Sequence, residues 1–126
     1  MSFILALSSA YIMYKMFGDK HDTPFIHVNI RKAHKYSGID PDSFNKFLEN
    51  IKLSIEKIDD PYVSSEHLYR GLDHLEDLAL YNNYDIHNEI REIITEIAYE
   101  IEQRILERSI VLNKPFNPRY LNDKIH

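Results

Sequence analysis

The seven histidines of this 126-residue chain are its first candidates for metal binding. The chain contains no cysteine, so thiolate ligands are excluded. His27 and His34 are seven residues apart, and His67 and His74 have the same spacing. On a helix such a pair lies about two turns apart, whereas metal-binding pairs usually lie four or fewer residues apart, as in the zincin motif, which this sequence lacks. Acidic side chains near the second pair could complete an ad hoc site: Glu66, Asp73 and Asp77. Polar helix surfaces produce such clusters by chance, so we expect no metal.

The sequence contains no signature of a catalytic or cofactor-binding site. Its three glycines do not form the Gly-rich loop that cradles a nucleotide phosphate. The lack of cysteine excludes disulfide scaffolds, thiol nucleophiles, Cys-ligated zinc and iron–sulfur clusters. No nucleophile elbow or Ser–Lys pair of known spacing occurs. We therefore expect a protein that is not an enzyme and binds no cofactor and no small-molecule substrate. A small hydrolase or metal-dependent enzyme is the less favoured hypothesis.

Charge is unevenly distributed along the chain, whose net value of -5 comes from 20 acidic and 15 basic residues. This balance argues against a nucleic-acid partner, which would need an excess of Lys and Arg. The charge balance is zero over residues 1–14, where no side chain is charged, +3 over 15–36, -10 over 37–112 and +2 over 113–126. We therefore divide the chain into an apolar head (1–18), a basic neck (19–39), an acidic helical bundle (40–112) and a C-terminal arm (113–126).

The apolar head is predicted to be a membrane anchor. A helix from Met1 to Phe17 would be about 25 Å long, against a membrane core of about 30 Å, so it could span a thin bilayer or insert in part. Its apolar side chains point in all directions around such a helix, and a water-soluble helix of this kind would need burial on every side. The residues expected in lipid are Phe3, Ile4, Leu5, Leu7, Tyr11, Ile12, Met13, Tyr14 and Phe17.

Two other interpretations of the apolar head remain open. A secretory signal peptide has a basic residue before its apolar run and a small-residue cleavage site after it. Ser8-Ser9-Ala10 resembles such a site, but no positive side chain precedes the run. The second interpretation is a buried N-terminal core helix, because runs of about 10 to 14 apolar residues often have that role. The apolarity of the head on all sides favours the anchor.

The basic neck supports the anchor interpretation. Lys15 and Lys20 are expected to contact anionic lipid headgroups, an attraction worth about 1 kcal/mol for each charge close to the surface. The lack of charge before the apolar run favours an orientation with the body on the cytosolic side. A plain solvated linker is the alternative.

Residues 23–38 carry conflicting signals of secondary structure. Thr23-Pro24 is typical of a helix start and Gly38 of a helix end, which favours a helix over 24–36. The alternation of apolar and polar residues around Val28 favours a short strand instead. We expect the helix, because no second convincing strand exists with which a strand could pair.

The acidic bundle begins with a well-marked helix. Asp40-Pro41 supplies an N-cap residue followed by a proline at the first helical position. Apolar residues then recur every three or four positions over 41–58, which places them on one helix face. Asp59-Asp60-Pro61 is expected to end this helix, because proline disfavours helical geometry in the residue before it.

Two further helices are expected in the acidic bundle. The second begins near Ser64 or Ser65, either of which can cap it, and Gly71 within it would allow a close helix contact. The third is capped by Asp85 and runs over 86–111 with a stripe of isoleucines. The glutamates expected on its solvated face are Glu89, Glu92, Glu96, Glu100 and Glu107. The predicted fold class is all-α, a small three- to four-helix bundle with an N-terminal apolar helix and an extended C-terminal arm.

The C-terminal arm contains Pro115 and Pro118 and is expected to be extended rather than helical. The residues predicted to bind a neighbouring protein subunit are Phe116, Tyr120 and Leu121. The alternative is a frayed tail.

The overall layout resembles that of small membrane-anchored minor structural proteins in the particles of large double-stranded DNA viruses. The resemblance rests on the uncharged stretch from Met1 to Tyr14, the compact helical remainder and a composition rich in Ile, Asn, Asp, Lys and Tyr. It implies a minor capsid protein of the virion that lies between the inner membrane and the capsid shell and ties the two together.

The residues and the resemblance together predict a non-enzymatic, membrane-associated tethering protein. Its N-terminus would insert in lipid, while its helices and its C-terminal arm would bind neighbouring subunits, either capsid subunits or further copies of this chain. The alternative hypothesis is a soluble helical adaptor or assembly module whose N-terminal helix is buried in an oligomer interface.

Overall fold

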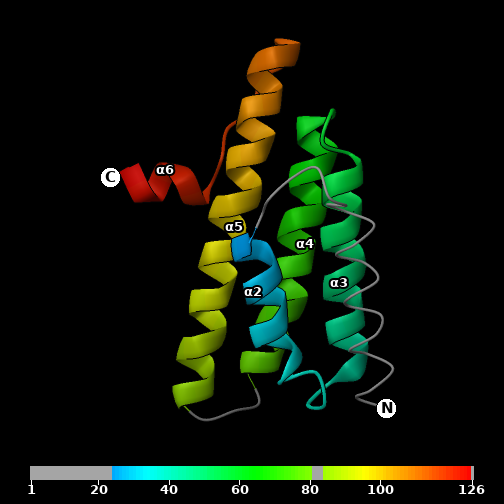
Figure 1. Ribbon diagram of the computed structural model, residues 1–126, viewed down its shortest axis with the longest axis vertical. Coiled ribbons are helices and arrows are strands. Elements are labelled where there is room, and N and C mark those ends of the chain that lie inside the picture. Colours follow the sequence, from blue (N-terminus) through cyan, green and yellow to red (C-terminus); the bar gives the residue numbers. More distant parts are fainter. Residues whose placement is uncertain (1–23, 81–83, 126) are drawn as a thin grey trace.

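The computed structural model describes residues 24–80 and 84–125, and every regular element within these ranges is an α-helix. The helices, labelled as in Figure 1, are α2 (Pro24–His34), α3 (Pro41–Glu56), α4 (Pro61–Ala79), α5 (Tyr84–Leu112) and α6 (Tyr120–Ile125). The predicted all-α class is confirmed for the described residues. Residues 1–18 lie outside them, so the anchor helix stays a prediction.

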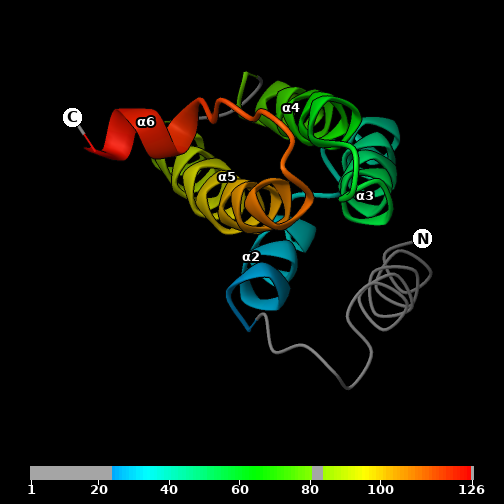
Figure 2. The ribbon, with the colours of Figure 1, turned by 90° about the horizontal axis from the view of Figure 1, so that it is seen from above.

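The four longer helices pack side by side, and α6 lies on the outside of α5. The helices α3, α4 and α5 are successive antiparallel neighbours, and α2 packs against α5 (Figures 1 and 2). Their facing sides form one core of buried apolar side chains: Ile26, Ile30, Ala33, Phe44, Phe47, Leu48, Ile51, Leu68, Leu72, Leu75, Leu78, Ala79, Ile90, Ile93, Ile94, Ile97, Ala98, Ile101 and Ile105. The bundle is therefore held together mainly by the burial of these apolar stripes.

The helix α2 settles the ambiguity of the neck in favour of the helical prediction. Ile26, Ile30 and Ala33 are at most 1 % exposed, so this part of the basic neck contributes to the core of the bundle. Just after α2, the Lys35 ammonium pairs with the Glu89 carboxylate of α5 at 2.6 Å. Lys35 and the hydroxyl of Tyr36 both donate to this carboxylate and thereby lower the pKa of Glu89.

The helix α3 begins at Asp40-Pro41, as predicted. The Asp40 carboxylate accepts a hydrogen bond from the backbone N–H of Ser43 at 3.2 Å and another from the Ser43 hydroxyl at 2.9 Å. These bonds satisfy a backbone donor that the first helical turn leaves without a partner, and they lower the pKa of Asp40.

The helix α4 begins before the residues predicted to cap it. Ser64 and Ser65 were wrong as N-cap candidates, because Asp60 caps α4 by accepting a hydrogen bond from the backbone N–H of Val63 at 3.2 Å. Ser64 is instead buried, and its hydroxyl donates to the Ser54 carbonyl of α3 at 2.7 Å. Asp60-Pro61 thus starts α4, since proline suits the first helical position, whereas α3 ends earlier, at Glu56.

The close contact predicted at Gly71 is confirmed where α4 crosses α3. A Cβ atom on Gly71 would lie 3.2 Å from the Cβ atom of Asn50 and 3.3 Å from the carbonyl oxygen of Phe47. These distances are tighter than ordinary van der Waals contacts, so a side chain at this position would push the two helices apart.

The helix α5 is the longest element and extends beyond the ends of α3 and α4 (Figure 1). It begins at Tyr84, slightly before the expected start, so that Asp85 lies within its first turn. It ends at Leu112, and the next residue, Asn113, has a φ of 55°, the left-handed conformation that asparagine tolerates better than most residues. The backbone N–H of Lys114 then donates to the Ser109 carbonyl at 2.9 Å, which satisfies one of the last carbonyl groups of α5.

Candidate functional site

The C-terminal segment docks on a buried carboxylate of α5. Glu102 is 0 % exposed. Its carboxylate accepts hydrogen bonds from three consecutive backbone N–H groups, those of Arg119, Tyr120 and Leu121, each at 2.9 Å. These groups lie at the N-terminus of α6, where backbone donors lack helical partners and the helix dipole favours a negative charge. Glu102 therefore caps a helix that is distant from it in the sequence.

Tyr69 of α4 completes this arrangement. Its hydroxyl also donates to the Glu102 carboxylate, and its ring lies 6.3 Å from the ring of Tyr120, centroid to centroid. The Arg119 guanidinium lies 4.1 Å from the centre of the Tyr69 ring, in a cation–π contact. Burial, followed by the hydrogen bond to Glu102, raises the pKa of the Tyr69 hydroxyl.

The charge of Glu102 is balanced by hydrogen-bond donors rather than by an ion pair. Among the ion pairs of the described residues, none includes Glu102. Hydrogen bonds to an ionised acceptor are about twice as strong as neutral ones, so this arrangement stabilises a buried carboxylate without a cation. The donors come from α4 and from the segment that leads into α6, so the carboxylate joins three helices.

The structure brings together the three residues that were predicted to bind a neighbour. Phe116 and Tyr120 are partly buried against the core of their own chain. Leu121 and Phe116 line a hollow of about 450 Å³ beside Leu106 of α5. Binding of these residues to another subunit stays a prediction, and in this structure they hold the C-terminal segment against α5.

The arm was expected to be extended, and it is only partly so. Residues 114–118 are not helical, which agrees with the two prolines, but Tyr120–Ile125 form the short helix α6. A six-residue helix is unstable alone, because few backbone bonds compensate the cost of nucleation. Its capping by Glu102 explains why it forms here.

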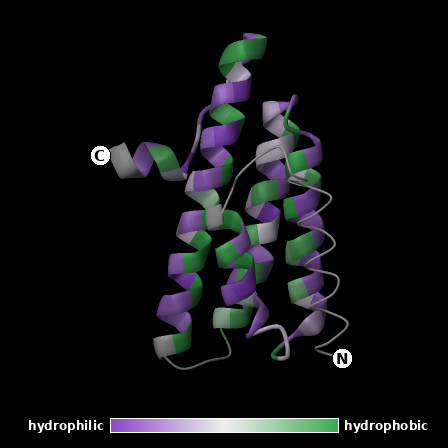
Figure 3. Cartoon of the chain, viewed as in Figure 1, coloured by the Kyte–Doolittle hydropathy of each residue, from purple (hydrophilic) through white to green (hydrophobic). Residues whose placement is uncertain are grey.

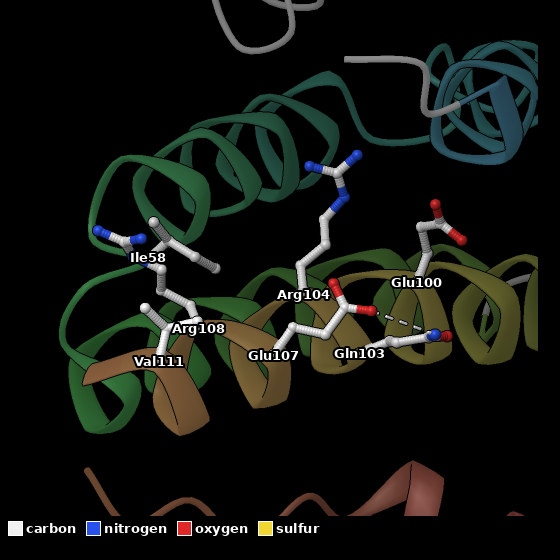
Figure 4. A pocket seen from close by; sticks show the side chains of 7 residues that line it. All are labelled: Ile58, Glu100, Gln103, Arg104, Glu107, Arg108 and Val111. Atoms are coloured by element: carbon white, nitrogen blue, oxygen red, sulfur yellow. Dashed lines mark hydrogen bonds between the residues drawn. The ribbon is translucent and has the colours of Figure 1, made fainter. Parts of the chain in front are cut away.

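A second hollow lies near the projecting end of α5 (Figure 4). It has a volume of about 590 Å³ and is lined by Ile58, Glu100, Gln103, Arg104, Glu107, Arg108 and Val111. Arg108 forms an ion pair with Asp59 at 2.6 Å, and the hydrogen bond from Arg108 lowers the pKa of Asp59. Lys114 donates to the Asp59 carbonyl at 2.7 Å. Aliphatic side chains and compensated charges therefore share this end of the molecule.

The histidines singled out in the sequence do not assemble a metal centre within residues 24–80 and 84–125, where no group of three potential ligands lies close enough together. His67 contacts Asn50 through its Nδ1 atom at 3.1 Å, and His74 lies 3.9 Å from Asp77. The His34 ring instead packs edge-on against Phe44. These contacts are those of helix-packing and surface residues.

The candidate membrane-anchor residues, together with Lys15 and Lys20, lie outside the described residues. In the part of the chain that the structure describes, no helix combines the length and apolarity that crossing a bilayer requires. Comparison with known proteins found no matching family model, no matching curated protein and no matching solved structure.

Proposed function

We propose that this protein is a non-enzymatic tether, with its N-terminal segment held in a membrane and its helical body bound to neighbouring protein subunits. The observation that carries the proposal is the uncharged stretch of residues 1–14, which has no polar face. Such a segment is expected to avoid water, and lipid is the environment that accepts it on all sides.

The helical body supports the other half of the proposal. It is a packed bundle whose surface also exposes apolar side chains away from the end of α5, among them Val28, Ile39 and Leu80, which are 45 %, 38 % and 68 % exposed. Such side chains are available to contact neighbouring proteins, because burying exposed apolar surface in an interface is favourable. Weak contacts of the body gain strength when the anchor confines the protein to one surface, because the second contact then forms at high effective concentration.

We further propose the location that the resemblance implies, in a virion between the inner membrane and the capsid shell. There a two-ended tether would join lipid to protein. The partners of the body would be capsid subunits or further copies of this chain.

Carbonate extraction of membranes from cells that produce the protein tests the anchor. The full-length chain is expected to stay with the membrane, because carbonate strips proteins held by charge but not those held by buried apolar side chains. A chain that begins at Asp19 keeps the whole described bundle and is expected to be released. Release of both chains would contradict the proposal, and full-length protein that is monodisperse without detergent would favour the soluble adaptor.

A further inference from the structure

One end of the bundle exposes several large apolar side chains. Ile110 and Val111 occupy the last turn of α5 and are each 71 % exposed, and Tyr62, in the first turn of α4 at the same end, is 75 % exposed. Figure 3 shows the hydrophobic colouring at the point where α5 projects past its neighbours. We call Tyr62, Ile110 and Val111 the apolar tip.

The Asp59 and Arg108 charges beside the apolar tip are compensated within the molecule. Asp59 pairs with Arg108, and Lys114 donates to the Asp59 carbonyl at 2.7 Å. A charge that already has a partner loses less when water is removed than an isolated charge does. The long stems of Arg108 and Lys114 also allow their heads to stay in water while the tip touches an apolar phase. The ion pair between Asp59 and Arg108 therefore lowers the cost of bringing the tip close to lipid.

The length of chain before α2 places the apolar tip within reach of the membrane that would hold the head. Because Lys35 and Glu89 pair at 2.6 Å, the end of α2 and the start of α5 lie side by side. At about 1.5 Å per residue, α2 runs about 15 Å from that level back to its start, and α5 runs about 35 Å from Glu89 to its end, so the end of α5 lies about 20 Å beyond the start of α2. Figure 1 shows α5 extending past the start of α2. The links from Phe17 to Pro24 span at most about 25 Å. The link is therefore long enough for the head and the tip to reach the same membrane surface.

We propose that the apolar tip is a second lipid-contact site, which inserts into the surface of the membrane that holds the N-terminal segment. This inference rests on the proposed function and deepens it, since two contacts would fix the orientation of the body while one would leave it free to rotate. The interaction is interfacial rather than membrane-spanning, because it uses three side chains around a helix end. It is expected to need no anionic lipid, because apolar side chains make the contact.

Fluorescence of a single introduced tryptophan tests the contact, because the natural chain contains no tryptophan. Val111→Trp places the probe in the tip of the full-length protein. Leu80→Trp is the matched control, since Leu80 is 68 % exposed at the end of α4, which lies at the opposite end of the bundle. Each variant is bound to phosphatidylcholine vesicles, with and without phosphatidylglycerol, and its emission and its quenching by brominated lipid are measured.

For Val111→Trp we expect emission at shorter wavelength and strong quenching by brominated lipid in both vesicle types, with neither effect for Leu80→Trp. In a second variant, Ile110→Ser together with Val111→Ser should weaken vesicle binding roughly tenfold, because two aliphatic side chains no longer enter the lipid.

Three results would overturn the inference. If the protein binds vesicles but the tryptophan of Val111→Trp stays as exposed as that of Leu80→Trp, there is no second lipid contact. The proposed function would remain intact in that case. If the emission of Val111→Trp shifts as the protein concentration rises in the absence of vesicles, the tip binds protein instead of lipid. Full-length protein that does not bind vesicles at all defeats both the inference and the proposed function.

Discussion

At the scale of single residues, Glu102 is the side chain on which the C-terminal segment depends. The sequence does not single it out, because it stands in a run of glutamates of which Glu92, Glu96 and Glu107 are exposed on a polar helix face, while Glu89 binds Lys35 and Tyr36. The available signal was its spacing, four residues after Ala98 and three before Ile105, which places it on a buried side of α5. Its partners on α4 and α6 come from distant parts of the chain, and no local pattern connects them to it.

Glu102→Gln is expected to loosen the C-terminal segment. The amide keeps the size of the side chain but replaces one charged acceptor oxygen by a donor that faces the backbone N–H groups of α6. The free energy of unfolding should fall by about 2 kcal/mol, and amide hydrogen exchange at Tyr120 and Leu121 should accelerate. Chemical denaturation and exchange measured by NMR check this. Glu107→Gln, an exposed glutamate of the same helix, is the control; equal behaviour of the two variants would rule out the capping role.

The Tyr69 hydroxyl makes stability sensitive to alkaline pH. Burial and the bond to Glu102 raise its pKa in the folded protein, whereas in the unfolded chain a tyrosine ionises near its usual pKa of about 10. Above about pH 10 the unfolded state therefore loses a proton that the folded state keeps, and the free energy of unfolding falls as pH rises. The contribution of the Tyr69 hydroxyl to the free energy of unfolding is therefore fully present below about pH 10 and is lost at higher pH.

Urea denaturation at about pH 8 and about pH 11 measures this effect. Tyr69→Phe is expected to cost about 1 kcal/mol at the lower pH, because the bond to Glu102 is lost. It should also reduce the loss of stability between the two pH values. Tyr36 and Tyr120 also have raised pKa values, so part of the loss should remain. A pH dependence unchanged from that of the natural protein would contradict this assignment. Tyr62→Phe, at an exposed position, is the control.

At the scale of elements, the apolar periodicity of α3, α4 and α5 made these helices predictable, because each buries one stripe in the core. Their ends were harder to predict. The sequence marks Asp40-Pro41 as a helix start and Asp60-Pro61 only as a stop, but in the structure Asp60-Pro61 starts α4, and α3 has already ended at Glu56. The helix α6 is too short to show periodicity, and it forms because its N-terminus meets a carboxylate from another helix.

The cap of α4 offers a direct test of this element. Asp60→Ala removes the acceptor of the Val63 N–H bond and is expected to lower the free energy of unfolding by about 1 kcal/mol. Ser65→Ala, at a residue formerly expected to cap the helix, should change stability much less, since its hydroxyl bonds only to the Tyr62 carbonyl within α4. Thermal denaturation of both variants measures the difference. A larger loss for Ser65→Ala would place the cap at the serine instead.

At the scale of the whole molecule, the chain combines an uncharged N-terminal stretch with a helical body that carries most of the acidic residues. The sequence predicted that contrast, and it predicted a helix in the neck. It did not predict that α2 would contribute to the core of the bundle, because the buried apolar residues Ile26, Ile30 and Ala33 give a weak pattern beside the basic residues that dominate this segment. The packing of α2 against α5 follows from contacts that only the folded chain brings together.

Flotation of the purified protein with phosphatidylcholine vesicles is the most direct test of the tether. We expect the natural chain to rise with the vesicles through a density gradient. A chain with Leu5→Lys and Ile12→Lys, which keeps the full length and every described helix, should stay at the bottom, because two ammonium groups in the apolar segment oppose its entry into lipid. Flotation of both chains, or of neither, would contradict the account.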